Sequence, residues 1–308
     1  MKRLSVPLLA FAIFPLQSLA DVQVYGKANV SLQHADETGD SKVELVSNAS
    51  RLGVKGSEEL GEGLEAIYQF EYQTFVDDGE GGGQTFTQRD IYVGVRGEFG
   101  TLMAGKANTP VKSAQGKIDL FNDLEGDINY LFAGDVRANN IVQYKSPRVA
   151  DYFSGSVAYI ASEVDGVDAG ISAAGHYQSD DQNLYLSVGL DQDVQQPGAD
   201  LVRLVARYSL NNVHIGALVE SYDDGAIDED GMLMSVLWEA SELWSFKAQA
   251  GSSDVNFGGG EQLSLGADYK LSDRAKLFGY YTNERNDFGC GGEGCDDQYL
   301  GAGISLSF

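Results

Sequence analysis

The sequence predicts an all-β protein, a 16-stranded antiparallel transmembrane β-barrel, from its alternating side chains, its glycine content and its lack of helical periodicity. The last eleven residues, QYLGAGISLSF, alternate without a break between apolar and small or polar side chains up to Phe308. Successive side chains of a strand point to opposite faces, so this segment has an apolar face and a polar face. The same pattern recurs many times upstream. With 38 glycines and only 5 prolines, the chain suits many strands joined by tight turns.

The N-terminus predicts export. Lys2 and Arg3 precede an apolar run, and Ser18-Leu19-Ala20 places small residues at the positions that a signal peptidase recognises. Residues 1–20 are therefore predicted to be a secretory signal peptide, and residues 21–308 the barrel domain. No later segment approaches the roughly eighteen consecutive apolar residues of a membrane-spanning helix.

Sixteen strands follow from the pattern in chain order. Residues 21–33 form the cleanest one, with Val22, Val24 and Leu32 on one face and Gln23 and Lys27 on the other. Many of the segments are about ten residues long, which is the length that a tilted strand needs to cross a bilayer. The remaining ranges are 50–57, 63–74, 86–99, 101–107, 139–146, 153–162, 169–178, 183–192, 201–210, 213–221, 232–240, 244–253, 262–271, 276–284 and 298–308.

A barrel explains this alternation better than an open sheet does. Hydrocarbon offers no hydrogen bonds to a strand edge, so a sheet in a membrane must close on itself. The polar faces then line a lumen, which sixteen strands make too wide for side chains to fill. A mean hydropathy of −0.21 is expected for such a chain. Short connections alternate with long ones, and the even strand number places both termini on the periplasmic side.

The charge of the chain is strongly acidic. Its 46 Asp and Glu against 21 Lys and Arg give a formal charge of −25, which argues against a nucleic-acid partner because phosphate binding needs basic residues. Acidic runs fall in expected loops at residues 36–40, 77–83 and 223–231, where a solvated surface is the simplest interpretation.

Two cysteines, Cys290 and Cys295, lie close together near the C-terminus. In an exported protein this spacing predicts a small local disulfide bond. A metal site would need more ligands than this segment supplies, so neither a metal ion nor another cofactor is expected.

No catalytic motif is found. The chain lacks the GxSxG, HExxH and P-loop patterns, and its three histidines are His34, His176 and His214. We therefore expect no enzyme. Two alternatives stay open from the residues alone: an exported soluble acidic β protein of the adhesin or lectin type, with Ca²⁺ on its Asp-rich loops, and an outer-membrane hydrolase with a Ser-His pair between strands.

Several linked motifs resemble those of a known family, the trimeric general-diffusion porins of Gram-negative outer membranes. They are VYGKANVSL, SRLGVKGSEELGEGLEAIYQFE, RDIYVGVRGEFGTLMAGKANTP, NNIVQYKSP and the terminal Phe308, and together they span the mature chain. Leu306 is a departure, because many close relatives carry His there. The resemblance implies a homotrimer in outer-membrane lipid that passes small hydrophilic solutes and ions. Because it ends the closing strand with an aromatic ring, Phe308 is the expected assembly signal.

The resemblance also implies that the third loop, within residues 108–138, folds into the barrel and narrows it. In such porins, basic residues of the wall face acidic residues of this loop. Carried over by motif, the basic positions are Lys27, Arg51, Lys106 and Arg137. The acids should come from Asp119, Asp123, Glu125 and Asp127, and the sequence does not choose among them.

Strand parity supports two of these basic positions. Lys27 and Arg51 belong to lumen-facing sets, and a basic residue facing lipid at mid-membrane would cost about 2–4 kcal/mol. Lys106 falls on the same face of its strand as apolar neighbours, so a bulge would be needed to turn its side chain into the lumen. Lys55 and Arg96 are expected to be solvated or salt-bridged surface residues.

Charge predicts the selectivity of such a pore. The loop acids match the basic wall residues in number, Glu65, Glu71 and Asp268 fall on lumen-facing positions, and the loops at the mouth are acidic. We therefore expect weak cation selectivity that grows as salt is lowered, since salt screens the mouth charges most.

Overall fold

A single antiparallel sheet that closes on itself forms the protein. The computed structural model describes residues 21–308 except 38, 80–82, 257–258 and 287–293. The signal peptide predicted over residues 1–20 lies outside the described residues. The strands are β1 (Asp21–Glu37), β2 (Asp40–Ser47), β3 (Arg51–Gly61), β4 (Leu64–Thr74), β5 (Phe86–Gly97), β6 (Gly100–Asn108), β7 (Arg137–Lys145), β8 (Phe153–Ile160), β9 (Gly170–Gln178), β10 (Leu184–Gln192), β11 (Asp200–Leu210), β12 (Val213–Asp223), β13 (Asp228–Glu239), β14 (Trp244–Ser253), β15 (Gly260–Lys270), β16 (Ala275–Asn286) and β17 (Cys295–Ser307).

These seventeen segments make sixteen barrel strands. β1 pairs with β2 over Val30 to Glu37 and with β3 over Asp21 to Lys27, so β2 and β3 are two halves of one strand. The break between them includes Ala49, whose φ of 47° lies in the left-handed region. The predicted barrel is confirmed, but the strand over 40–47 was missing from the prediction because its polar residues read as a loop.

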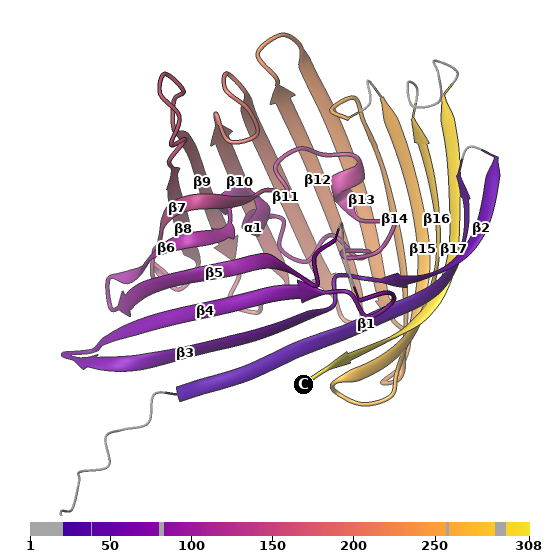
Figure 1. The fold of residues 1–308 in the computed structure, drawn as a ribbon, viewed down its shortest axis with the longest axis horizontal. Coiled ribbons are helices and arrows are strands. Elements are labelled where there is room, and N and C mark those ends of the chain that lie inside the picture. Colours follow the sequence, from indigo (N-terminus) through magenta and orange to yellow (C-terminus); the bar gives the residue numbers. More distant parts are fainter. Residues whose placement is uncertain (1–20, 38, 80–82, 257–258, 287–293) are drawn as a thin grey trace, which may run out of the picture.

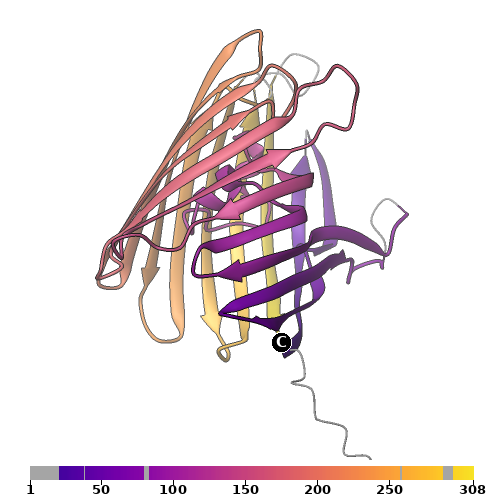
Figure 2. The same cartoon turned by 90° about the vertical axis from the view of Figure 1, so that its left-hand side faces the viewer.

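The barrel closes between its first and last strands. β1 and β17 pair with Lys27 opposite Ser307, and the backbone of Phe308 extends this pairing through two 3.1 Å hydrogen bonds with Gly26. Figures 1 and 2 show the C-terminus beside the first half of β1 and the strands tilted around a common interior.

Alternation along the strands separates an outer from an inner face. On β11, Val202 and Leu204 are 45% and 48% exposed on the outside, whereas Arg203 and Val205 are buried on the inside. An apolar outer face and a polar inner face are the pattern of a barrel in lipid. In the described part of the chain, no helix has the length and apolar character to cross a membrane.

The segment between β6 and β7 lies inside the barrel (Figure 1). It carries two short helices, α1 (Pro110–Ala114) and the 3-10 turn η1 (Ile128–Tyr130). Thr109 caps α1 and Asp127 caps η1, each accepting a hydrogen bond from a backbone N–H of its helix. We call residues 109–136 the lumen loop.

Apolar side chains attach the lumen loop to the inner wall. Ile118, Ile128, Leu131 and Phe132 pack against inward-facing Val205, Leu218 and Leu233 of β11 to β13, and Phe121 packs against Phe278 and Tyr280 of β16. Glycines make this contact possible.

A Cβ atom at Gly231 would lie 2.6 Å from the Phe132 ring, and one at Gly251 would lie 2.6 Å from a methyl group of Leu131. Larger side chains there would push the loop off the wall. The wall therefore has a recess that matches the loop.

Candidate functional site: the constriction of the lumen

One loop carboxylate faces the basic wall. Asp123 accepts hydrogen bonds from Lys27 Nζ on β1 at 3.0 Å and from Arg51 Nη2 on β3 at 2.5 Å. Lys27 and Arg51 are directly opposite each other across the β1–β3 pairing. Asp123 has a φ of 68°, a left-handed conformation that Asp tolerates better than most residues. This triad joins the lumen loop to β1 and β3.

The other predicted acids have different partners. Asp127 accepts from the backbone N–H groups of Asn129 and Asp123, both at 3.0 Å, so it shapes the loop around η1. Asp119 accepts from the N–H of Phe121 at 3.1 Å. Glu125 accepts from Gln33 Nε2 at 2.9 Å.

The lumen loop also tunes the charge of its own carboxyls. Burial, with repulsion from Asp127, raises the pKa of Asp119 to about 7, and burial raises the pKa of Asp127 to about 6. For Asp123, burial acts against ionisation, but the charges of Arg51 and Lys27 outweigh it and hold its pKa below the ordinary value. Asp123 is therefore fully ionised at neutral pH, whereas Asp119 carries only part of a charge.

A second set of ion pairs continues along the wall. Arg89 donates to Glu71 at 2.7 Å, and Arg137 donates to Asp90 at 2.6 Å. Adjacent Arg89 and Asp90 both reach lumen partners because the register between β4 and β5 shifts between Phe70 and Tyr72. Arg137, predicted from the sequence, lies among these pairs.

Arg89 was missing from the sequence prediction. Strict alternation assigns it to the lipid side with Ile91, and only the bulge turns it inward. The free-energy cost of an arginine side chain that faces lipid could have indicated that Arg89 points into the lumen.

Lys106 lies apart from this network. Its Nζ donates to Asn139 Oδ1 at 2.9 Å, and within the described residues no ion pair joins it to a loop acid. The register does shift between Gly105 and Ala107, where the sequence required a bulge, but the shift does not bring Lys106 to Asp123. Lys55 lies 5.2 Å above the Tyr25 ring, and Arg96 pairs with Glu65 at an exposed position.

Two further predicted positions lie at the ends of strands. The ring of Phe308 covers Gly26, where a Cβ atom would come within 2.4 Å of it. Cys295 begins β17 and is not a free thiol. Cys290 lies outside the described residues, so its pairing with Cys295 stays a prediction.

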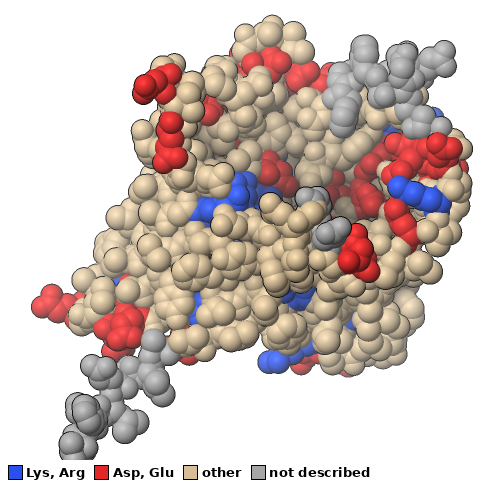
Figure 3. All heavy atoms as spheres, viewed as in Figure 1, with Lys and Arg blue, Asp and Glu red and all other residues tan. Residues whose placement is uncertain are grey.

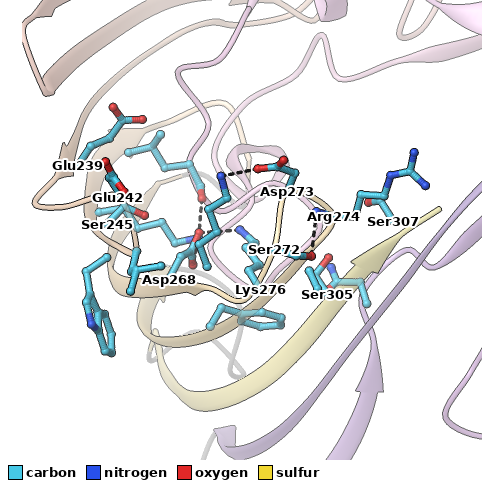
Figure 4. A pocket seen from close by; sticks show the side chains of 18 of the residues that line it. Glu239, Glu242, Ser245, Asp268, Ser272, Asp273, Arg274, Lys276, Ser305 and Ser307 are labelled. Atoms are coloured by element: carbon cyan, nitrogen blue, oxygen red, sulfur yellow. Dashed lines mark hydrogen bonds and ion pairs between the residues drawn. The ribbon is translucent and has the colours of Figure 1, made fainter.

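The lumen loop separates two polar cavities. One has a volume of ≈ 1190 Å³ and is lined by the four loop acids together with Arg51, Arg89, Lys112 and Arg137. The other, of ≈ 740 Å³, lies at the end with short turns, where Lys247 and Lys276 both approach Asp268 (Figure 4). Asn122 and Leu124 line both cavities, so this part of the loop lies between them.

Acidic side chains dominate the rim at the end with long loops. In Figure 3, red side chains lie along the upper edge of the molecule and around the opening beside β1 and β2, with few blue ones among them. In the described part of the chain, no group of three or more His, Cys, Asp or Glu has the arrangement of a metal site.

A closed barrel with an apolar outside, a polar lumen and a loop that narrows this lumen defines a membrane channel. The chain belongs to the Gram-negative porin family, whose model matches residues 8–289. It is an outer-membrane porin and not an enzyme, as its relatives show. This excludes the soluble adhesin-like protein and the hydrolase that the sequence alone left open.

Relatives and solved structures agree with this family. The major outer membrane protein P.IB of Neisseria gonorrhoeae is 28% identical over 80% of this chain and 73% of its own length. Outer membrane porin protein 32 of Delftia acidovorans is 26% identical over 88% of this chain and 87% of its own. The anion-selective porin from Comamonas acidovorans has a TM-score of 0.79 at 24% identity, covering 94% of this chain and all of that one.

Proposed function

We propose that the protein lets small hydrophilic solutes and ions diffuse passively through its lumen, past a constriction built from Lys27, Arg51 and Asp123. One observation carries this proposal: the lumen loop lies inside the barrel, and the cavity beside it is lined by acids of the loop and by Arg51, Arg89 and Arg137 of the wall, so a solute must pass between charged groups. A narrow polar passage with fixed charges selects solutes by size and charge.

We further propose weak cation selectivity. The wall cations Lys27, Arg51, Arg89 and Arg137 each have an acidic partner within 3.0 Å, so their fields are largely compensated. The acids of the rim are in excess and attract cations to the mouth. Because Asp119 is only partly ionised, the loop contributes less negative charge than four full carboxylates would.

The Comamonas porin is described as anion-selective, and at 24% identity its selectivity is a property of that protein. In this chain, the test is the zero-current potential of single channels across a KCl gradient, measured at high and low salt. We expect a cation-selective sign that strengthens at low salt. At 0.1 M salt the field of a charge at the mouth reaches only about 10 Å, and it reaches further as the salt concentration falls. An anion-selective sign at both salt concentrations would overturn the proposed cation selectivity. Absence of any conductance would contradict the proposed diffusion through the lumen.

We propose that the protein acts as a homotrimer. A solved porin of Vibrio cholerae, 16% identical to this chain, is described in a trimer form. In this chain the outer face of the wall formed by β3 to β5 exposes Leu52, Phe70 and Val93, which suits contact with a second copy or with lipid. Cross-linking in detergent would test the assembly, with a single monomer band as the contrary result.

A further inference from the structure

Two charged residues are buried in the barrel wall where the last part of the lumen loop, near Ala133, packs against it. Arg203 of β11 and Glu220 of β12 lie opposite each other in the strand register. Their side chains are 0% exposed. Arg203 donates to Glu220 Oε2 through Nε at 2.7 Å and through Nη2 at 2.5 Å.

The pair holds one residue of the loop by its backbone. The N–H of Ala133 donates to Glu220 Oε1 at 2.9 Å, and the carbonyl oxygen of Ala133 accepts from Arg203 Nη2 at 2.8 Å. The next residue, Gly134, has a φ of 63°, and a Cβ atom there would lie 3.0 Å from Nη2. The loop therefore turns away from the wall directly after the contact, at a position that favours glycine.

Simple filling of the wall does not explain this pair. Neighbouring inward positions that contact the loop, Val205 and Leu218, are apolar. Desolvating an Arg and a Glu is costly, and an apolar pair often serves stability equally well. What charged side chains add at this place is a donor and an acceptor for the peptide groups of Ala133.

We propose that Arg203 and Glu220 are positioning residues of the pore: they clamp the lumen loop at Ala133 and thereby keep Asp123 in place between Lys27 and Arg51. The proposal rests on the channel function proposed above. A chain of contacts links the two ends. Ala133 is the third residue after η1, η1 is capped by Asp127, and Asp127 also accepts from the N–H of Asp123.

The clamp acts together with other contacts of the loop. Asn256 Nδ2 donates to the carbonyl of Tyr130 at 3.1 Å, and Gln262 Nε2 donates to that of Asp127 at 3.2 Å. The apolar attachment of Leu131 and Phe132 remains as well. Without the clamp the loop should stay in the lumen but fluctuate, so the pore should lose its single, steady conductance.

The main test is the double variant Arg203→Met with Glu220→Leu. Replacing both charges by apolar groups should preserve the barrel, which heat-modifiable migration in gels would show. In single-channel recordings we expect at least about a twofold rise in open-channel current noise and closure at lower voltage, because local openings become frequent where contacts are few. Arg203→Lys, which keeps a charged donor, should lie between wild type and the double variant.

Glu65→Leu with Arg96→Met is the matched control, because it removes an ion pair of β4 and β5 that is exposed and does not contact the lumen loop. Gly134→Ala perturbs the clamp from the loop side and leaves the barrel sequence intact, so it should show the same noise. Wild-type noise and closure voltage in both the double variant and Gly134→Ala would overturn the clamp. A wild-type protein that does not conduct at all would instead refute the channel function.

Discussion

The two sides of the lumen loop differ in the way they meet the barrel. Toward β11–β16 the loop packs closely against the wall, and we call this its dry side. Ile118, Phe121 and Ile128 are completely buried there. Toward β1 and β3, which we call its wet side, the loop borders a polar cavity and makes contact through two carboxylates, Asp123 with Lys27 and Arg51 and Glu125 with Gln33. The first side fixes where the loop lies, and the second sets the field that a passing ion experiences. Because different residues serve the two purposes, size and charge selection should be separable by mutation.

The largest effect should come from the dry side. Leu131→Asp places a carboxylate at a position that is 1% exposed, against a methyl-sized recess at Gly251. Burying an unpaired charge is prohibitively costly, so this part of the loop should leave the wall. We expect single-channel conductance to rise by about twofold, since part of the obstruction moves aside. Asn129→Asp, which adds the same charge at an exposed loop position, should keep near-normal conductance, and an unchanged Leu131→Asp pore would contradict the assigned role of the dry side.

A smaller, purely electrostatic effect should come from the wet side. Asp123→Asn removes the partner of Lys27 and Arg51 and leaves both charges uncompensated. We expect the ratio of cation to anion permeability to fall about twofold to threefold, equivalent to roughly 0.4–0.7 kcal/mol. Arg51→Ala should raise the same ratio. The zero-current potential across a tenfold KCl gradient measures the permeability ratio of each variant. Equal potentials in the two variants would show that Lys27, Arg51 and Asp123 do not determine the ion selectivity.

How much of this site could be predicted from the sequence depends on the range of the forces involved. Period-two alternation decided the barrel and the inward direction of Lys27 and Arg51, because strand parity is a local property. Arg89 was missed because a bulge reverses that parity, and the bulge arises from pairing with a distant strand. The strand half over residues 40–47 was missed for another reason, because its polar residues read as a loop.

The choice among the loop acids depended on tertiary contacts. Asp127 could have been recognised as a cap, because it directly precedes the short helical turn of residues 128–130. No local pattern shows that Asp123 reaches a wall 72 residues away in sequence. No local pattern shows that Arg203 and Glu220 bind the backbone of Ala133 either, because their positions in the alternating strands indicate only that they face inward.

Assembly should be separable from both sides of the loop. Phe308 lies at the seam between β1 and β17 and covers Gly26, away from the constriction. Phe308→Asp should lower the amount of folded protein in the outer membrane several-fold, because the seam must close before every backbone group is paired. Channels that do fold should conduct like wild type. Normal amounts of heat-modifiable protein would contradict the role of Phe308 as an assembly signal.

The smallest effect should come from the cysteines, of which Cys295 begins β17 and is not part of the lumen loop. If Cys290 and Cys295 are paired, they close a very short stretch of chain before β17, and the chain-entropy model limits the stabilisation to at most about 3 kcal/mol. Replacing both by Ser should therefore leave conductance and selectivity unchanged and lower thermal stability slightly. A maleimide should label the native wild-type protein only after reduction. Labelling without reductant would show free thiols, and a changed conductance in the double variant would mean that this staple holds a part of the pore after all.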